Sequence, residues 1–124
     1  MIQRDYVLRQ VHQLAQVLAE VLFRARSGSH EDAQAHLADG LASALGVELG
    51  DVLSMPREAL VARCSPGGEV SGELALALAD LLRESDAPGA RVRALWLYRL
   101  ARRSDAAVPL DLDDRIARLA RDAP

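Results

Sequence analysis

The stretch RALWLYRLARR, residues 93–103, has the residue types that proteins use to hold nucleic acids or acidic partners. It contains the only Trp of the chain, one of its two Tyr residues and four of its fifteen basic residues, all of them arginines. Aromatic rings can stack on bases, and guanidinium groups can pair with phosphates or carboxylates. The same residue types also make an ordinary amphipathic helix of a packed bundle, so their spacing has to decide between the two interpretations.

A helical wheel at about 100° per residue places Trp96 on the apolar side of this helix. Ala94, Leu97, Leu100 and Ala101 share that side, most arginines lie opposite, and Arg93 is the exception. Base stacking would need the ring beside the arginines, so we expect core packing for Trp96 and no nucleic-acid binding. The alternative is a hot spot for a protein partner, since Trp and Arg are enriched there. Its residues would be Arg91, Trp96, Arg99, Arg102 and Arg103.

Other residue types that could do chemistry lack the necessary spacing. His30 and His36 are about 240° apart on a helix and cannot share a metal ion, and no Cys or His lies at ligand spacing from His12. The glycines of SPGGEVSG, residues 65–72, follow no strand and lack the Lys of a phosphate-binding loop. Cys64 has no His near it in the sequence. We therefore expect no metal, no cofactor and no catalytic residue, and hence no enzyme.

Composition indicates a globular chain. Its 124 residues are 50% hydrophobic and 27% charged, which predicts one domain over residues 1–124. The net charge of −3 argues against broad nucleic-acid affinity. A single Cys excludes an intramolecular disulfide, and charges at Arg4, Asp5 and Arg9 interrupt any signal peptide. No apolar run is long enough to span a membrane. We expect a cytoplasmic protein.

Basic residues other than His are all arginines, and Lys, Asn and Thr are absent from the sequence. Codon bias in a GC-rich genome would give this composition. A functional need for bidentate pairing by arginine would give it as well.

Apolar spacing of three and four residues predicts helices throughout, and no segment shows the period-two alternation of a strand. The ranges are about 3–26, 30–45, 56–63, 71–84, 90–103 and from 111 onward, with one or two short turns near 47–55. Gly28 and Gly46 end the first two helices, and Ser29 with Asp32 resembles a capping box. The predicted buried face of the second helix is Ala33, Leu37, Leu41, Ala44 and Leu45. That of the fifth helix, 71–84, is Leu74, Leu78, Leu81 and Leu82.

The first helix carries a seam of alternating four- and three-residue spacing, which is typical of helix–helix packing. Leu8, Ala15 and Leu22 widen this stripe beyond what one neighbouring helix would cover. We therefore expect part of the seam to remain free for a second copy of the chain. The residues of this predicted self-association site are Val11, Leu14, Leu18 and Val21.

Two parts of the chain repeat one pattern. Gly28, Ala33 and Leu37 have the same spacing as Gly89, Ala94 and Tyr98. A small residue followed by a large one resembles the second helix of a tetratricopeptide hairpin, and residues 74–109 resemble one loose unit of that kind. The first helix of this unit differs from the tetratricopeptide pattern, because it does not carry the Trp, Gly and Tyr that are typical there.

The element order resembles that of a family of small bacterial tetratricopeptide-like proteins of unknown function. The residues that carry this resemblance are 2–23, 53–64 and 94–98. It implies an all-α fold of antiparallel helical hairpins, about five to seven helices in all, and it supplies no catalytic residues.

Two functions remain open from the sequence. The first is a non-catalytic interaction or scaffold domain that binds a protein or peptide, with the arginines suited to an acidic partner. The alternative is a self-associating structural protein that dimerises through its long N-terminal helix. A third interpretation gives the arginines no binding role: they only solubilise the surface and pair with nearby Asp and Glu residues.

Overall fold

The computed structural model describes the backbone of residues 2–122 and the side chains of residues 4–122. Within this part of the chain every regular element is helical, which confirms the predicted all-α fold. The elements are α1 (Ile2–Arg26), α2 (His30–Leu45), α3 (Leu49–Ser54), α4 (Arg57–Arg63), a short 3-10 helix η1 (Pro66–Gly68), α5 (Gly72–Leu82), α6 (Ala90–Arg103) and α7 (Leu112–Asp122).

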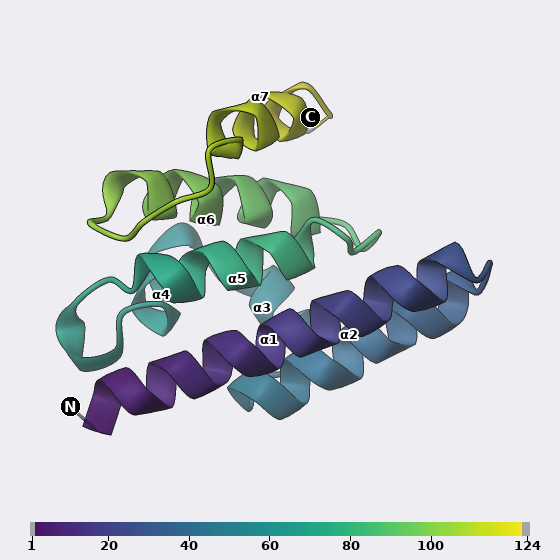
Figure 1. Ribbon diagram of the computed structural model, residues 1–124, viewed down its shortest axis with the longest axis horizontal. Helices are drawn as coiled ribbons and strands as arrows, with labels where there is room; N and C mark the ends of the chain where they lie inside the picture. Colours follow the sequence, from purple (N-terminus) through teal and green to yellow (C-terminus); the bar gives the residue numbers. More distant parts are fainter. Residues whose placement is uncertain (1, 123–124) are drawn as a thin grey trace.

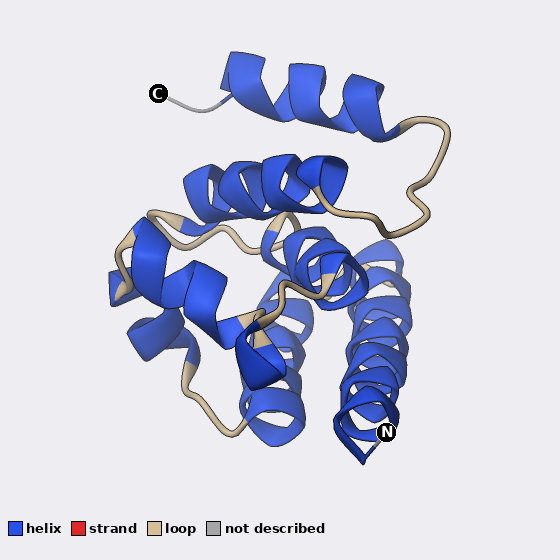
Figure 2. Ribbon diagram, turned by 90° about the vertical axis from the view of Figure 1, so that its left-hand side faces the viewer, coloured by secondary structure: helices blue, strands red, loops and turns tan. Residues whose placement is uncertain are grey.

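Two antiparallel hairpins make the body of the molecule (Figure 1). Helices α1 and α2 form the first hairpin and α5 and α6 the second, and α1 packs along α5. The short helices α3 and α4 connect the hairpins, and α4 contacts α6. Helix α7 packs on the outer side of α6 and closes that end of the stack (Figure 2). None of the described helices is both long and apolar enough to cross a membrane.

The ends of the first helices follow the local sequence. Gly28 has φ +86° and Gly46 has φ +70°, a left-handed conformation that glycine adopts without steric cost, so α1 and α2 end where the sequence predicted. The predicted capping box is wrong in detail. Ser29 occupies the N-cap position of α2, but its side chain accepts no capping hydrogen bond. The hydroxyl of Ser71 does cap α5, accepting a hydrogen bond from the backbone N–H of Leu74 at 3.1 Å.

The core is one cluster with members from all seven α-helices. All nine residues predicted for the buried faces of α2 and α5 are buried. Helix α5 is the central element, because α1 covers one side of it and α6 another. In the repeated pattern, Ala33 and Ala94 are 1% and 0% exposed, and Leu37 and Tyr98 are both 0% exposed.

The predicted free seam on α1 is wrong for two of its four residues. Leu14 is 0% exposed and Val21 is 2% exposed, so both belong to the core of the chain itself. Val11 and Leu18 are half-buried and pack against the same core. The apolar stripe is wide because α1 has two neighbours within the chain, α2 and α5. The outward side of α1 is mixed: Asp5, Arg9, His12 and Gln16 are exposed there, and so are the large side chains of Tyr6 and Phe23.

Candidate partner-binding surface

Helix α6 positions most of the residues with binding chemistry. It begins after Gly89, runs to Arg103, and buries Ala94, Leu97 and Ala101. Of the predicted hot-spot residues, Trp96, Arg99 and Arg103 share one side, since their directions differ by only about 20–60° at 100° per residue. Arg99 and Arg103 are exposed, and Trp96 is half-buried. The helix thus presents an aromatic edge beside two cations.

Trp96 is the contact point between α6 and α4. The guanidinium carbons of Arg57 and Arg93 each lie 5.1 Å from the centroid of the Trp96 ring. At that distance a guanidinium interacts favourably with an aromatic ring. Trp96 packs against the core, as predicted. The predicted placement of the arginines opposite it is wrong for Arg99 and Arg103, because spacings of three and seven residues put them on its own side of the helix. Trp96 lies at the boundary between core and surface, where the two groups meet.

Hydrogen bonds fix the position of Arg93. Its Nε and Nη2 atoms donate to the backbone carbonyl of Met55, at 3.2 Å and 2.8 Å. Its Nη1 atom donates to the carbonyl of Gly89 at 3.1 Å. Met55 follows the last residue of α3, so Arg93 ties α6 to the end of that helix. A guanidinium held in this way loses little further freedom when a ligand binds.

We call the residues Arg57, Arg93, Trp96, Arg99 and Arg103 the Arg–Trp surface. Between residues 4 and 122, no carboxylate lies within salt-bridge distance of any of its four guanidinium groups. The interpretation in which surface arginines pair with neighbouring acids therefore does not describe these four arginines. Two of these four guanidinium groups, those of Arg57 and Arg93, lie over the Trp96 ring, and the other two extend along the same side of α6.

The other two predicted hot-spot residues lie elsewhere on α6. Arg91 and Arg102 point about 120–140° away from Trp96 around the helix. Both are exposed, and the Nε of Arg102 pairs with the Asp113 carboxylate of α7 at 2.9 Å. The structure therefore divides the predicted set, with three residues in the Arg–Trp surface and two on the side toward α7.

Sequence reasoning missed Arg57 and gave Arg93 no role. Arg57 is the first residue of α4 and 39 positions before Trp96, and no local pattern relates the two. The helical wheel did mark Arg93 as unusual, because it was the exception among the arginines of residues 93–103. A long cation at such a position either remains buried with partners or lies along an aromatic neighbour.

Tyr98, the other aromatic residue of the stretch, takes no part in this surface. Its ring is 0% exposed, and its hydroxyl donates a hydrogen bond to Asp80 of α5. Arg115 of α7 donates to the same Asp80 oxygen at 3.0 Å and also pairs with Asp111 at 3.1 Å. Burial raises the pKa of Tyr98, and the hydrogen bond to Asp80 raises it further. The hydrogen bond from Arg115 lowers the pKa of Asp111. This network fixes α7 against α5 and α6.

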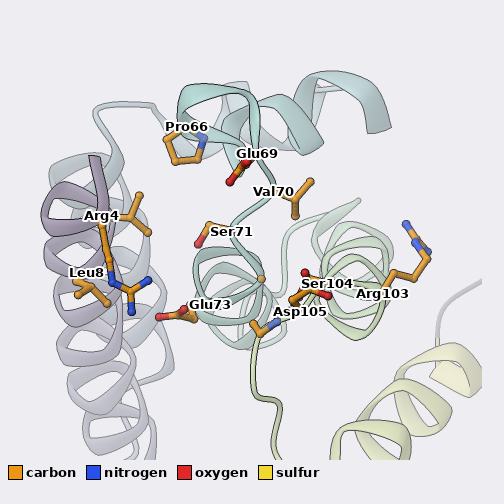
Figure 3. A pocket seen from close by; sticks show the side chains of 13 residues that line it. Arg4, Leu8, Pro66, Glu69, Val70, Ser71, Glu73, Arg103, Ser104 and Asp105 are labelled. Carbon is orange, nitrogen blue, oxygen red and sulfur yellow. Dashed lines mark hydrogen bonds between the residues drawn. The ribbon is translucent and has the colours of Figure 1, made fainter. Parts of the chain in front are cut away.

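A groove of about 730 Å³ lies at the end of the molecule where α1 and α5 begin and α6 ends. Figure 3 shows Arg4 and Leu8 on one wall and the segment Glu69–Ser71 above them. Glu73, Arg103 and Asp105 also line the groove. The charges of this groove are mixed, so they favour no class of ligand.

Groups that could catalyse a reaction are few among the described residues. Burial raises the pKa of the Cys64 thiol to about 12, an effect that the charge of Arg63 partly offsets, so the thiol is protonated and a poor nucleophile at neutral pH. His30 pairs with Asp86 at 2.6 Å, and both side chains are exposed. No group of three or more His, Cys, Asp or Glu residues in the described part of the chain is placed to hold a metal ion.

Comparisons of the chain with known proteins found no matching family model, no matching curated protein and no matching solved structure.

Proposed function

We propose that this chain is a non-catalytic, tetratricopeptide-like interaction domain that binds an acidic segment of a partner protein through the Arg–Trp surface. The observation that carries this proposal is a set of four guanidinium groups without a carboxylate partner among the described residues, two of which lie over the half-buried Trp96 ring. Carboxylates are the complementary groups, since arginine pairs with them in charge-assisted, often bidentate geometry.

Preorganisation supports the same role. Arg93 is held by three hydrogen bonds, and Arg57 lies against the Trp96 ring. Ordering a free arginine on binding costs about 0.5–1.5 kcal/mol, and this cost is reduced for side chains that are already held. Trp and Arg are also the residue types most enriched at the energetic centres of protein interfaces.

A protein partner fits this surface better than a nucleic acid. Two guanidinium groups already lie against the Trp96 ring, which leaves less of it available for stacking on a base. The chain carries a net charge of −3, so acidic residues elsewhere would oppose a long polyanion. A short acidic peptide meets only the local patch.

Isothermal titration calorimetry with a twelve-residue peptide of alternating Glu and Ala tests the proposal. The double variant Arg99→Glu/Arg103→Glu should bind the peptide at least about tenfold more weakly, because it reverses two charges of the patch. The matched control Arg26→Glu/Arg121→Glu makes the same change in net charge at exposed positions of α1 and α7. It should bind the peptide with nearly unchanged affinity.

Two outcomes would contradict the proposal. Equal affinities of the two double variants would mean that the Arg–Trp surface is not the binding surface. Tighter binding of a single-stranded oligonucleotide than of the peptide would mean that the partner is a nucleic acid.

A further inference from the structure

A second cavity, of about 220 Å³, lies beside the N-terminal half of α1, and none of its lining residues belongs to the Arg–Trp surface. The chain assembles it from four helices that are distant in sequence: α1, α2, α4 and α5. The residues that matter for its chemistry are Tyr6, Gln10, Leu45, Arg63, Leu74 and Leu78. Its size is appropriate for a small molecule, since a dry cavity of about 150 Å³ in another protein binds benzene.

Gln10 is the unusual member of this set. It belongs to the buried stripe of α1 and is only 8% exposed. Its Nε2 donates to the hydroxyl of Tyr6 at 3.3 Å. No hydrogen bond from another described residue reaches its Oε1 atom, and since no buried side-chain oxygen lacks a partner, this oxygen remains accessible from the cavity. Gln10 therefore offers one accessible acceptor, Oε1, to water or to a ligand in the cavity.

The charge of the cavity has one sign. Among the described residues that line it, Arg63 is the only charged one, and none is Asp or Glu. One nitrogen of Arg63, Nη2, donates to the carbonyl of Leu45 at 2.6 Å, which places the guanidinium at the cavity and leaves other N–H groups free. The Cys64 thiol also lines the cavity and is neutral, because burial raises its pKa to about 12.

We propose that this cavity binds a small carboxylate with a compact apolar body, of about the size of benzoate. The apolar body packs on Leu45, Leu74 and Leu78, and the carboxylate pairs with Arg63. Gln10 and the exposed Tyr6 supply polar contacts at the mouth of the cavity. This site is independent of the Arg–Trp surface, so either can fail without the other.

Nuclear magnetic resonance titration of the full chain tests the site, with benzoate as the probe and benzyl alcohol as its neutral counterpart. Benzoate should shift the methyl signals of Leu74 and Leu78 and the amide signal of Cys64, and it should bind at least about tenfold more tightly than benzyl alcohol. Shifts centred on Trp96 would overturn the proposal, as would the absence of saturable shifts with benzoate.

Variants of Arg63 separate a binding role from a structural one. Arg63→Gln should weaken benzoate binding about tenfold and leave benzyl alcohol binding within about twofold, whereas Arg63→Lys should restore most of the benzoate affinity. Gln10→Leu should weaken the binding of both probes and leave the fold intact, since leucine suits the buried stripe. The control Arg26→Gln removes an equal charge at the exposed end of α1, outside both proposed sites, and should change neither affinity. If Arg63→Gln binds benzoate as well as the unchanged protein does, the proposal is wrong.

Discussion

Trp96 and Tyr98 are two residues apart, and they differ in burial and in the charge of the groups that they contact. A step of two residues turns the helix by about 200°, so the Tyr98 ring enters the core while the Trp96 ring lies at the surface boundary. Tyr98 has the partly exposed carboxylate of Asp80 as its partner, and Trp96 has two guanidinium groups. The aromatic residues of one short motif therefore serve two purposes, one stabilising α7 and one shaping a surface.

Alkaline stability reports on Tyr98. Its pKa lies above the ordinary value of 10.0, so the unfolded chain loses this proton at lower pH than the folded chain does. The contribution of protonated Tyr98 to the free energy of unfolding is therefore fully present below pH 10, and it is lost as the pH rises above 10. We expect urea denaturation to show a falling free energy of unfolding above this pH, with a smaller fall in Tyr98→Phe.

The same substitution should cost about 1–3 kcal/mol at neutral pH, because it removes a hydrogen bond to a charged acceptor. Tyr6→Phe is the matched control, since that ring is exposed, and it should retain the alkaline loss. An unchanged pH profile in Tyr98→Phe would show that the Tyr98–Asp80 contact does not couple to folding.

Thiol reactivity reports on Cys64. Its side chain is 0% exposed and its pKa is about 12, so both access and ionisation limit its reaction at pH 8. We expect an aromatic disulfide reagent to modify the native chain at least about a hundredfold more slowly than the chain in denaturant. Comparable rates would place Cys64 at the surface or in a frequently opened part of the fold.

At the scale of elements, the hairpin of α1 and α2 depends on a close approach that the sequence pattern did not indicate. A Cβ atom added at Gly40 would lie 2.5 Å from Cγ1 of Val17 and 2.6 Å from its Cγ2. The residue that permits close packing in this hairpin is therefore Gly40 in the middle of α2. Helix ends and buried faces could be predicted because they depend on neighbours in the sequence. The fit between two helices depends on which side chains meet, and periodicity does not contain that information.

Gly40→Ala tests this contact. Alanine favours a helix by about 1 kcal/mol over glycine, so an exposed site would gain stability. Here we expect a net loss of about 1–3 kcal/mol through overpacking, measured by thermal or urea denaturation. Val17→Ala makes room, so the double variant Val17→Ala/Gly40→Ala should be more stable than the sum of the two single effects. Strict additivity would mean that the two positions do not touch.

Glutamate substitutions along α1 test whether its stripe is core or free surface. Leu14→Glu places a charge in a fully buried position, and we expect it to unfold the chain. Gln16→Glu, two residues further on the exposed side, should leave the circular dichroism spectrum unchanged. A folded Leu14→Glu monomer obtained from a dimeric parent in sedimentation would restore the seam as an interface between copies.

At the scale of the whole molecule, both candidate sites arise where elements distant in sequence meet. The Arg–Trp surface joins α4 to α6, and the smaller cavity joins α1, α2, α4 and α5. The sequence predicted Trp96, Arg99 and Arg103 because they share one helix. It could not place Arg57 beside them or Gln10 beside Arg63, because those pairs form only when the hairpins stack. The sequence could not show that Leu14 and Val21 are covered for the same reason, since α5 packs on the stripe of α1 from a distant part of the chain.

Intrinsic fluorescence gives the most direct test of the proposed interaction surface, because Trp96 is the only Trp in the chain. Titration with a peptide of alternating Glu and Ala adds no other fluorophore. We expect a saturable change in Trp96 emission, with several-fold weaker binding in Arg57→Ala and loss of the change in Arg99→Glu/Arg103→Glu. Unchanged Trp96 emission in the native protein at millimolar peptide would contradict the proposal that the Arg–Trp surface receives an acidic partner.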